Sequence, residues 1–251
     1  MEDTQRIDVN ADAGESFGRW ALGADVELAA LVSSINVACG WHAGDPATMV
    51  TSVLLAKEHG IALGAHPGFP DLVGFGRRAM AFSPAEAAQA IVYQFGALRA
   101  LADLHDVPVQ HVKPHGSLYG LLCKDDAVAD EVSDAVAAVD PSLLIVLEAG
   151  PVAERQRGRG HRVVAEGFAD LEYTDEGRII IDPSNGRRDP QWCADQTAEI
   201  LAGRVHSAGG IESQISAQSI CLHSDRPGAA ENAVAVTARI RDLGYTIEAV
   251  R

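Results

Sequence analysis

Hydrophobic and polar residues alternate near the start of the chain. Ile7, Val9 and Ala11 are apolar, and one polar residue separates each from the next. Successive side chains of a β-strand point to opposite faces, so this pattern predicts a strand with one apolar and one polar face. The polar face carries Asp8, Asn10 and Asp12, and the strand runs into Gly14-Glu15. Because α/β proteins keep their chemistry at the carboxyl ends of strands, we expect these side chains to approach a functional site.

Similar apolar segments recur along the chain, each followed by a turn and usually by an alanine-rich helix. Further strands are predicted at 34–39, 61–65, 107–113, 143–147, 163–166 and 219–222. Helices are predicted at 25–32, 45–59, 83–105, 125–139, 189–201 and 229–243. Repeated units of this kind form one parallel sheet, and seven uninterrupted strands fit a closed barrel better than an open sheet. We therefore predict an α/β fold, a single-domain seven-stranded parallel β/α barrel over residues 1–251. We also expect a long loop or small hairpin at 170–189 and a short strand at 245–250.

Composition and charge narrow the class of protein. The chain is 47% hydrophobic and 22% charged, as expected for a globular protein, and it contains no apolar run long enough to span a bilayer. The formal net charge of −15 disfavours nucleic acid and anionic membranes as partners. The polar, acidic start does not resemble a secretory signal, so we expect a cytoplasmic protein. Its four separated cysteines, Cys39, Cys123, Cys193 and Cys221, are expected to be buried free thiols.

Histidines lie at the ends of several predicted strands. His42, His66, His115 and His223 each stand beside glycine, proline or aspartate, and they are four of the nine histidines in the chain. A single histidine after a strand is more often a structural hydrogen-bonding residue than a catalytic one. In a parallel barrel, however, the carboxyl ends of all strands converge on one mouth. The set is therefore expected to form a site.

Two chemistries fit this set of side chains. Asp8, Asp12, His42, His66 and His115 offer the ligand types that a divalent metal accepts, although their spacing matches no compact metal motif. Alternatively, the carboxylates and histidines act as general acids and bases whose pKa values depend on one another's charges. The residues alone leave both alternatives open.

Lys113 is one of only three lysines in the chain. It is two residues from both His111 and His115, so the three side chains are expected on the same face of an extended segment. A solvated surface lysine is a poor explanation at that position, so we expect Lys113 to bind an anion or a carbonyl group.

Asp45 precedes a proline at a predicted helix start, where capping is its default role. The pair Arg77-Arg78 either binds a phosphate or carboxylate or is a solvated surface pair. No phosphate-binding loop of the Walker type and no nucleophile elbow is recognisable.

With these residues assembled, the chain resembles the LamB/YcsF family, which contains the A subunit of bacterial ATP-dependent 5-oxoprolinase. The resemblance runs nearly end to end and rests on DVNADAGE at 8–15, NVACGWHAGD at 36–45, GAHPGFPD at 64–71, HVKPHG at 111–116, FAD at 168–170 and CLH at 221–223. It implies a barrel of the glycoside hydrolase/deacetylase type. It also implies ATP-driven opening of the lactam of 5-oxoproline to L-glutamate, in a complex with two other subunits.

That reaction gives the strand-end residues specific expected roles. Catalytic roles are expected for Asp12, Glu15, His66, Lys113 and His115, and substrate-binding roles for Asn10, His42, Asp45 and His223. Lys113 and the histidines would stabilise anionic groups and transfer protons, and Asp12 or Glu15 would orient water. ATP is the expected cosubstrate, and either this chain or one of its partner subunits would bind it. Another candidate is a divalent metal, with Asp8, Asp12, His42, His66 and His115 as its ligands.

The sequence departs from the family pattern at three places. Leu171 stands where members usually carry arginine, residues 180–182 replace a segment that usually contains another arginine, and Ser224 replaces a usual glycine. Arginine is a natural partner for a carboxylate or phosphate, so an altered substrate is an expectation that these differences raise. Two other interpretations remain: a stand-alone, metal-dependent amide or N-acetyl hydrolase, and a non-catalytic ligand-binding component of a complex. Fold analogy does not separate them.

Overall fold

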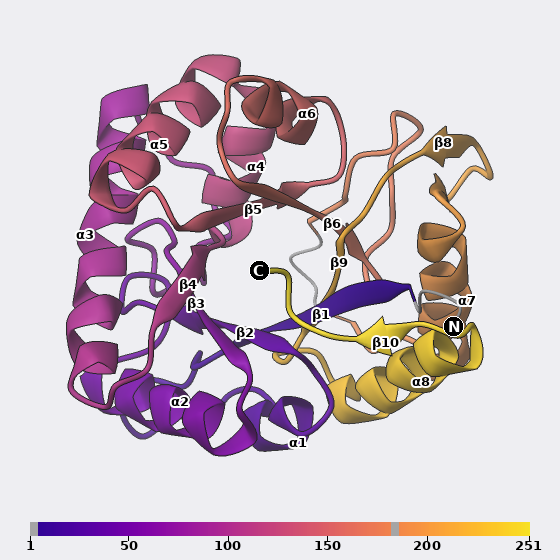
Figure 1. The fold of residues 1–251 in the computed structure, drawn as a ribbon, viewed down its shortest axis with the longest axis horizontal. Helices are drawn as coiled ribbons and strands as arrows, with labels where there is room; N and C mark the ends of the chain where they lie inside the picture. Colours follow the sequence, from indigo (N-terminus) through magenta and orange to yellow (C-terminus); the bar gives the residue numbers. More distant parts are fainter. Residues whose placement is uncertain (1–4, 182–185) are drawn as a thin grey trace.

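The computed structural model describes residues 5–181 and 186–251, and its centre is a closed barrel of seven parallel strands (Figure 1). The barrel strands are β1 Arg6–Ala13, β2 Ser34–Ala38, β3 Ala62–His66, β4 Val109–Val112, β5 Leu144–Glu148, β6 Val163–Phe168 and β9 Ser219–His223. They pair in chain order, and β9 pairs with both β6 and β1 to close the ring. The predicted seven-stranded parallel barrel is confirmed.

Helices surround the barrel. They are α1 Asp25–Ala29, α2 Pro46–His59, α3 Pro84–Asp103, α4 Gly116–Lys124, α5 Asp126–Val139, α6 Pro151–Gly158, α7 Pro190–Leu201 and α8 Ala229–Asp242. The predicted caps are present: Asp45 caps α2, Ser83 and Glu86 form a capping box at α3, and Asp189 caps α7. Figure 1 shows the helices as an outer layer, with α3 packed against α5 and α7 against α8.

Four short elements were not predicted. Helix α4 begins directly at Gly116 and contains a second glycine, so its helix propensity is low, and α6 is short and rich in arginine. Strands β7 Arg204–His206 and β8 Glu212–Gln214 form a small antiparallel hairpin of mostly polar residues. Within 170–181, Tyr173 and Ile179 form an antiparallel bridge, consistent with the expected loop or hairpin. The expected C-terminal strand is present as β10 Thr246–Ile247.

The predicted alternation of β1 sets the layers of the barrel. Val9, Ala11 and the matching apolar residues of neighbouring strands belong to the hydrophobic core. The alternate, polar residues of β1 bond to side chains from other barrel strands across the interior. Strand register brings Asp12 level with Asn36 on one side and with His223 on the other. The barrel interior is therefore polar, and its uppermost layer lies where the strands end.

The C-terminal segment covers the opposite end of the barrel. In Figure 1 the chain terminus lies over the centre of the strand ring. The side-chain amide of Gln110 donates to the carbonyl of Val250 at 2.8 Å, and Val250 packs against Leu144, Val146 and Val164. With the amino-end opening occupied in this way, the carboxyl ends of the strands are left to form the site.

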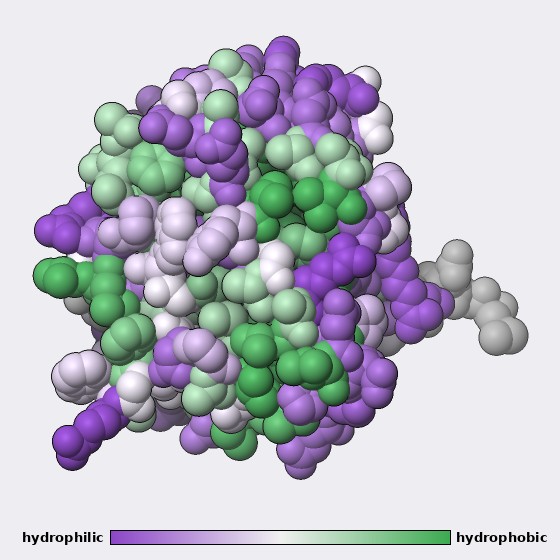
Figure 2. Space-filling view, turned by 90° about the vertical axis from the view of Figure 1, so that its left-hand side faces the viewer, coloured by the Kyte–Doolittle hydropathy of each residue, from purple (hydrophilic) through white to green (hydrophobic). Residues whose placement is uncertain are grey.

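The surface seen in Figure 2 mixes hydrophilic side chains with small hydrophobic groups. Among residues 5–181 and 186–251, every helix is too short or too polar to cross a bilayer. All four cysteines lie within the described residues and are buried free thiols, as expected.

Candidate functional site

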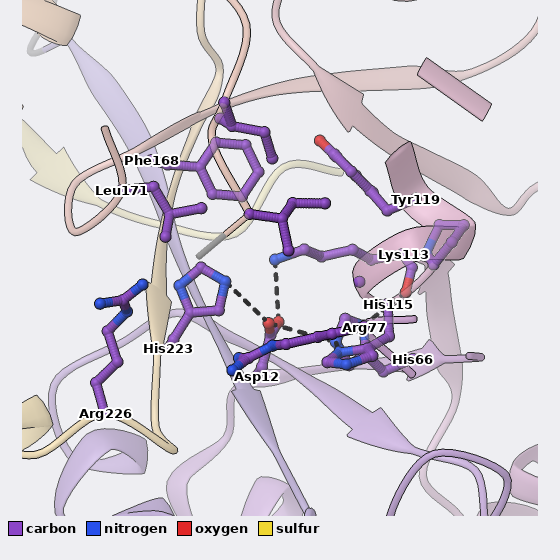
Figure 3. Close-up of a pocket in the computed structure, with 14 residues that line it drawn as sticks. Asp12, His66, Arg77, Lys113, His115, Tyr119, Phe168, Leu171, His223 and Arg226 are labelled. Carbon is purple, nitrogen blue, oxygen red and sulfur yellow. Dashed lines mark hydrogen bonds and ion pairs between the residues drawn. The ribbon is translucent and has the colours of Figure 1, made fainter. Parts of the chain in front are cut away.

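A small pocket, with a cavity volume of about 40 Å³, opens at the carboxyl ends of the barrel strands (Figure 3). Its lining combines charged groups with apolar ones, the arrangement usual for a small-molecule site. The lining residues are Asp12, His66, Arg77, Lys113, Pro114, His115, Gly116, Tyr119, Phe168, Leu171, Ile179, Ile181, His223 and Arg226. Four of the five residues expected to be catalytic lie here, and the fifth, Glu15, lies next to His115.

Lys113 is the charged centre of the barrel interior and is 2% exposed. Its Nζ lies 2.9 Å from Asp12 Oδ1, 3.1 Å from Asn10 Oδ1 and 3.2 Å from Glu166 Oε2, and it also contacts Cys221 Sγ at 2.9 Å. Burial alone would lower the pKa of Lys113, but Asp12, Cys221 and Glu166 raise it well above its ordinary value. The ammonium is therefore charged, and its position inside the barrel excludes a surface role.

A layer of amides beneath Lys113 fixes the orientation of Asp12. The Asn36 side chain donates to Asp12 Oδ1 at 2.9 Å and to Asn10 Oδ1 at 2.7 Å. Asn10 donates in turn to Glu166 and Ser219. Burial would raise the pKa of Asp12, but His66 and Lys113 hold it well below its ordinary value. Asp12 is thus a fixed carboxylate at the pocket floor.

Three histidines and one glutamate gather beside Asp12. His66 Nε2 lies 3.3 Å from Asp12 Oδ2 and 3.0 Å from His115 Nδ1. Glu15 Oε1 lies 3.6 Å from His115 Nδ1 and 3.5 Å from His42 Nε2. The His42 ring stacks on that of His115 with centroids 3.8 Å apart. All four side chains are buried, and burial is the largest cause of the lowered pKa values of His42 and His115.

The opposite wall of the pocket carries a second polar group. His223 Nδ1 lies 2.9 Å from Asp170 Oδ1, and His223 Nε2 lies 3.6 Å from Asp12 Oδ2. Burial would lower the pKa of His223, but the Asp170 carboxylate raises it above its ordinary value. Arg226 is 4% exposed, and its Nε lies 3.8 Å from Asp170 Oδ2. Figure 3 shows His223 and Lys113 approaching Asp12 from different sides.

The two arginines of the glycine-rich loop separate in the structure. Arg77 lines the pocket and pairs with Asp225 at 2.8 Å. Arg78 is mostly exposed and pairs with Asp71 in the same loop. Only Arg77 of this pair therefore offers a positive charge to a bound anion.

Two of the expected site residues lie elsewhere. Asp8 lies one layer below Asn10, where it accepts hydrogen bonds from Ser33, Ser34 and Ser219, so it is not placed among the strand-end histidines. The alternation of β1 puts Asp8 on the inner face but cannot show how deep in the barrel it lies. Asp45 caps α2 and also accepts from the Gly18 backbone at 2.7 Å, which agrees with its default capping role and not with substrate contact.

Several residues of the site were not predicted from the sequence. Asn36 and Glu166 lie on predicted strands, where an isolated polar residue in an apolar segment was the available signal. Arg226 lies in the turn after β9 and had no signal of its own. Of the departures from the family pattern, Leu171 lines the pocket and Ser224 is buried near Gly23, whereas Asp182 lies outside the described residues.

Among residues 5–181 and 186–251, two groups of side chains have the composition and closeness needed for a metal ion. One is Glu15, His42, His66 and His115, and the other is Asp12, Cys221 and His223. In the second group, Asp12 and Cys221 already contact the Lys113 ammonium, which would repel a cation. The pocket as a whole places a fixed carboxylate, a fixed ammonium and several imidazoles around one small space. It can bind an anionic substrate, stabilise developing charge and move protons.

Comparisons with known proteins agree with this geometry. The sequence profile of the LamB/YcsF family matches residues 7–251. The chain is 44% identical to the A subunit of 5-oxoprolinase from Thermus thermophilus, covering 97% of this chain and 99% of that protein. It is 40% identical to the protein of the same name from Pyrococcus furiosus, over 96% of both chains.

Solved structures give the same picture. The crystal structure of the lactam utilization protein from Thermus thermophilus matches with a TM-score of 0.88 and 43% identity, over 98% of this chain and 100% of that one. A family 4 carbohydrate esterase from Streptomyces lividans matches with a TM-score of 0.52 and 10% identity, over 98% of this chain and 93% of that one, which shows a shared fold alone. The full-length profile match and the relatives above 40% identity establish that this chain belongs to the LamB/YcsF family.

Proposed function

We propose that this chain is the A subunit of an ATP-dependent 5-oxoprolinase, which opens the lactam of 5-oxoproline to L-glutamate together with partner subunits. The observation that carries the proposal is the buried Lys113–Asp12 pair at the floor of a pocket that also contains two arginines. A lactam with one carboxylate needs a cation for that carboxylate and fixed charges at the amide. The names of the near full-length relatives give the same activity and imply further subunits.

Arg226 is the group that we assign to the substrate carboxylate. The family arginine expected at position 171 is replaced by Leu171, but Leu171 and Arg226 line the same pocket. The Arg226 guanidinium donates through Nη1 to the carbonyl of Gly186 and lies 3.8 Å from Asp170, and its buried Nε has no hydrogen-bond partner among the residues that the structure describes. Since a guanidinium and a carboxylate pair well in a buried site, Arg226 can supply the charge that Leu171 lacks. The departure at Leu171 is therefore compatible with 5-oxoproline as substrate.

The chemistry requires activation of a stable amide. The lactam carbonyl oxygen attacks the γ-phosphorus of ATP, an O–P bond forms, and ADP leaves with the electrons of the broken P–O bond. Water then adds to the activated carbon, the C–N bond breaks, and the amine takes a proton. A second water hydrolyses the resulting acyl phosphate to glutamate and phosphate. Lys113 and Arg77 would stabilise the anionic oxygens, and Asp12 and the imidazoles would orient water and carry protons.

The direct test is release of glutamate from 5-oxoproline by this chain combined with its partner subunits. We expect release with ATP and none without it. Release by this chain alone and without ATP would instead support the amide hydrolase that the deacetylase-like fold suggests. Undiminished release from a complex carrying Lys113→Met would show that this chain binds the ligand for a partner and does not perform the chemistry.

A further inference from the structure

Two imidazole nitrogens face each other at the edge of the pocket, and neither carries a proton when the rings are neutral. His66 Nδ1 lies 2.7 Å from the carbonyl oxygen of Lys113, and His115 Nε2 lies 2.8 Å from that of Phe75. A carbonyl oxygen only accepts, so each of these nitrogens must donate its hydrogen. The other nitrogens, His66 Nε2 and His115 Nδ1, then present lone pairs to each other across 3.0 Å.

Two carboxylates add to this concentration of acceptors. Asp12 Oδ2 lies 3.3 Å from His66 Nε2, and Glu15 Oε1 lies 3.6 Å from His115 Nδ1. The second oxygen of Glu15 is buried and has no hydrogen-bond partner within the described parts of the chain. Acceptors brought together in a buried space repel one another unless a positive charge lies between them. A proton on one of the two imidazoles relieves this repulsion, and so does a proton on Glu15, whose pKa burial raises well above its ordinary value; the alternative is a metal ion that takes the place of that proton.

The spacing of the acceptors fits a metal ion. Zinc bonds of about 2.0–2.2 Å in a tetrahedron place neighbouring ligand atoms about 3.3–3.6 Å apart. The two separations here, 3.0 Å for His66–His115 and 3.6 Å for His115–Glu15, bracket that range. All three ligand atoms lie within 4.8 Å of one another. The two carbonyls also hold both rings by their remote nitrogens, an arrangement that commonly orients metal-binding histidines.

His42 belongs beside this ligand set and not within it. Its ring is stacked on His115 with an angle of 3° between the planes. A metal ion lies in the plane of the imidazole that binds it, so two parallel stacked rings cannot both bind one ion. His42 is fully buried, and its Nε2 points at Glu15 Oε1 from 3.5 Å, where it can orient that carboxylate. Three protein ligands then remain, which leaves the fourth position of a tetrahedral ion open.

We propose that Glu15, His66 and His115 form a binding site for a divalent transition-metal ion such as zinc, with one open coordination position at the edge of the pocket. His66 and His115 both line the pocket, so an ion here lies next to the space assigned to the lactam. Such an ion acts as a Lewis acid when bound. The site deepens the proposed function, but binding of the ion itself does not depend on it.

The test is a titration of the chelator-treated full chain with Co²⁺ and Zn²⁺, without substrate or partner subunits. We expect one equivalent of Co²⁺ to bind and to give the visible absorption of a low-coordinate site. We also expect Zn²⁺ to shift the ¹⁵N resonances of His66 Nε2 and His115 Nδ1 in particular. Glu15→Gln and His66→Gln should weaken binding about 100-fold or more, and His42→Gln about 10-fold. His59→Gln, at an exposed position on α2, should leave it unchanged.

The outcomes separate this site from the proposed reaction. Failure of the wild-type chain to bind either ion would overturn the metal site, and ¹⁵N shifts of a doubly protonated imidazole would then assign the positive charge to a proton. The metal site would also be overturned if His59→Gln weakened metal binding as much as His66→Gln does. A chain that binds the ion but releases no glutamate in its complex would contradict the proposed reaction and leave the metal site intact.

Discussion

The ammonium nitrogen of Lys113 lies 2.9 Å from Oδ1 of Asp12, and both side chains are almost completely buried. Asp12 lies on β1 and Lys113 directly follows β4, and barrel closure brings them together. A charge removed from water is tolerated only when it is paired and hydrogen-bonded. The pair therefore links the integrity of the barrel interior to the chemistry of the pocket above it.

Lys113→Met should destabilise the protein. The change removes the ammonium but leaves Asp12 and Glu166 buried without their cation, which costs about 3–5 kcal/mol in free energy of unfolding. Denaturant unfolding followed by circular dichroism measures this loss. Lys124→Met is the matched control, because Lys124 is exposed at the end of α4, and its change should stay within about 0.5 kcal/mol. Equal effects of the two substitutions would contradict the structural role of Lys113.

Gly64→Ala should also destabilise the protein. A methyl group at Gly64 on β3 would overlap the His111 ring, whose Nε2 lies 2.7 Å from Asn36 Oδ1. Because both backbone and ring are buried, we expect a loss of at least about 2 kcal/mol from overpacking and a disturbed hydrogen bond. Gly96→Ala is the control: apart from the adjoining residues and backbone of helix α3, nothing lies within 4 Å of the new methyl group, so a gain of roughly 0.5–1 kcal/mol is expected. An unchanged free energy of unfolding in Gly64→Ala would show that the layer of His111 and Asn36 can shift to accommodate the methyl group.

Arg226→Leu should weaken substrate binding more than it slows turnover. The change removes the guanidinium that would donate charged hydrogen bonds to the carboxylate of 5-oxoproline. We therefore expect KM to rise about 10- to 100-fold. Steady-state kinetics of the assembled complex measures it. Arg241→Leu, at an exposed position on α8, should leave KM unchanged. A fall in kcat at constant KM would place Arg226 with the reacting atoms and not with the substrate carboxylate.

Asp170→Asn should lower the pKa of His223, which Asp170 raises against the opposing effects of burial and Lys113. Asp12 also raises it, so part of the elevation should persist. Titration of the His223 imidazole by NMR measures the change, with the exposed Asp103→Asn as control. An unchanged His223 pKa in Asp170→Asn would show that Asp170 does not hold the proton on this ring.

The Asp170–His223 pair should make the free energy of unfolding depend on pH. A folded-state pKa that lies above the unfolded one stabilises the protein below the unfolded value, about 6.5, and the contribution is lost as pH rises through the folded value. Asp170 has a lowered pKa, so its own contribution is lost as pH falls towards that lowered value. The free energy of unfolding should therefore fall more on His223→Gln at pH 5.5 than at pH 8. A pH-independent difference would mean that folding leaves the pKa of His223 unchanged.

The sequence predicted the barrel well because its signals are local. Alternation in β1, the Asp45-Pro46 cap and the capping box at Ser83 each lie within a few residues, and the structure contains all three. Helix α4 was missed because its glycines lower its helix propensity, although Leu118 and Leu122 pack it firmly into the core. Tertiary packing decided its structure, and local propensity did not.

The site was predictable only as a set of strand-end residues. The two-residue alternation of β1 showed that Asp8 and Asp12 point to the same face of the strand. Only the closed barrel shows that Asp8 accepts hydrogen bonds from serines in a lower layer, whereas Asp12 contacts Lys113. Arg226 gave no signal because it faces the pocket only through the turn after β9. Depth in the barrel and the direction of a turn depend on residues far apart in the chain, so a pattern along the sequence does not contain them.

The most direct test of the proposed function is the rate of ATP-dependent glutamate release from 5-oxoproline by the assembled complex, with wild-type chain and with Lys113→Met. The variant is first shown to be folded and incorporated under the assay conditions. We expect release by the wild-type complex and at least about a 100-fold lower rate with the variant, because the fixed ammonium stabilises the charge that develops during lactam opening. Equal rates would contradict a catalytic role for this pocket.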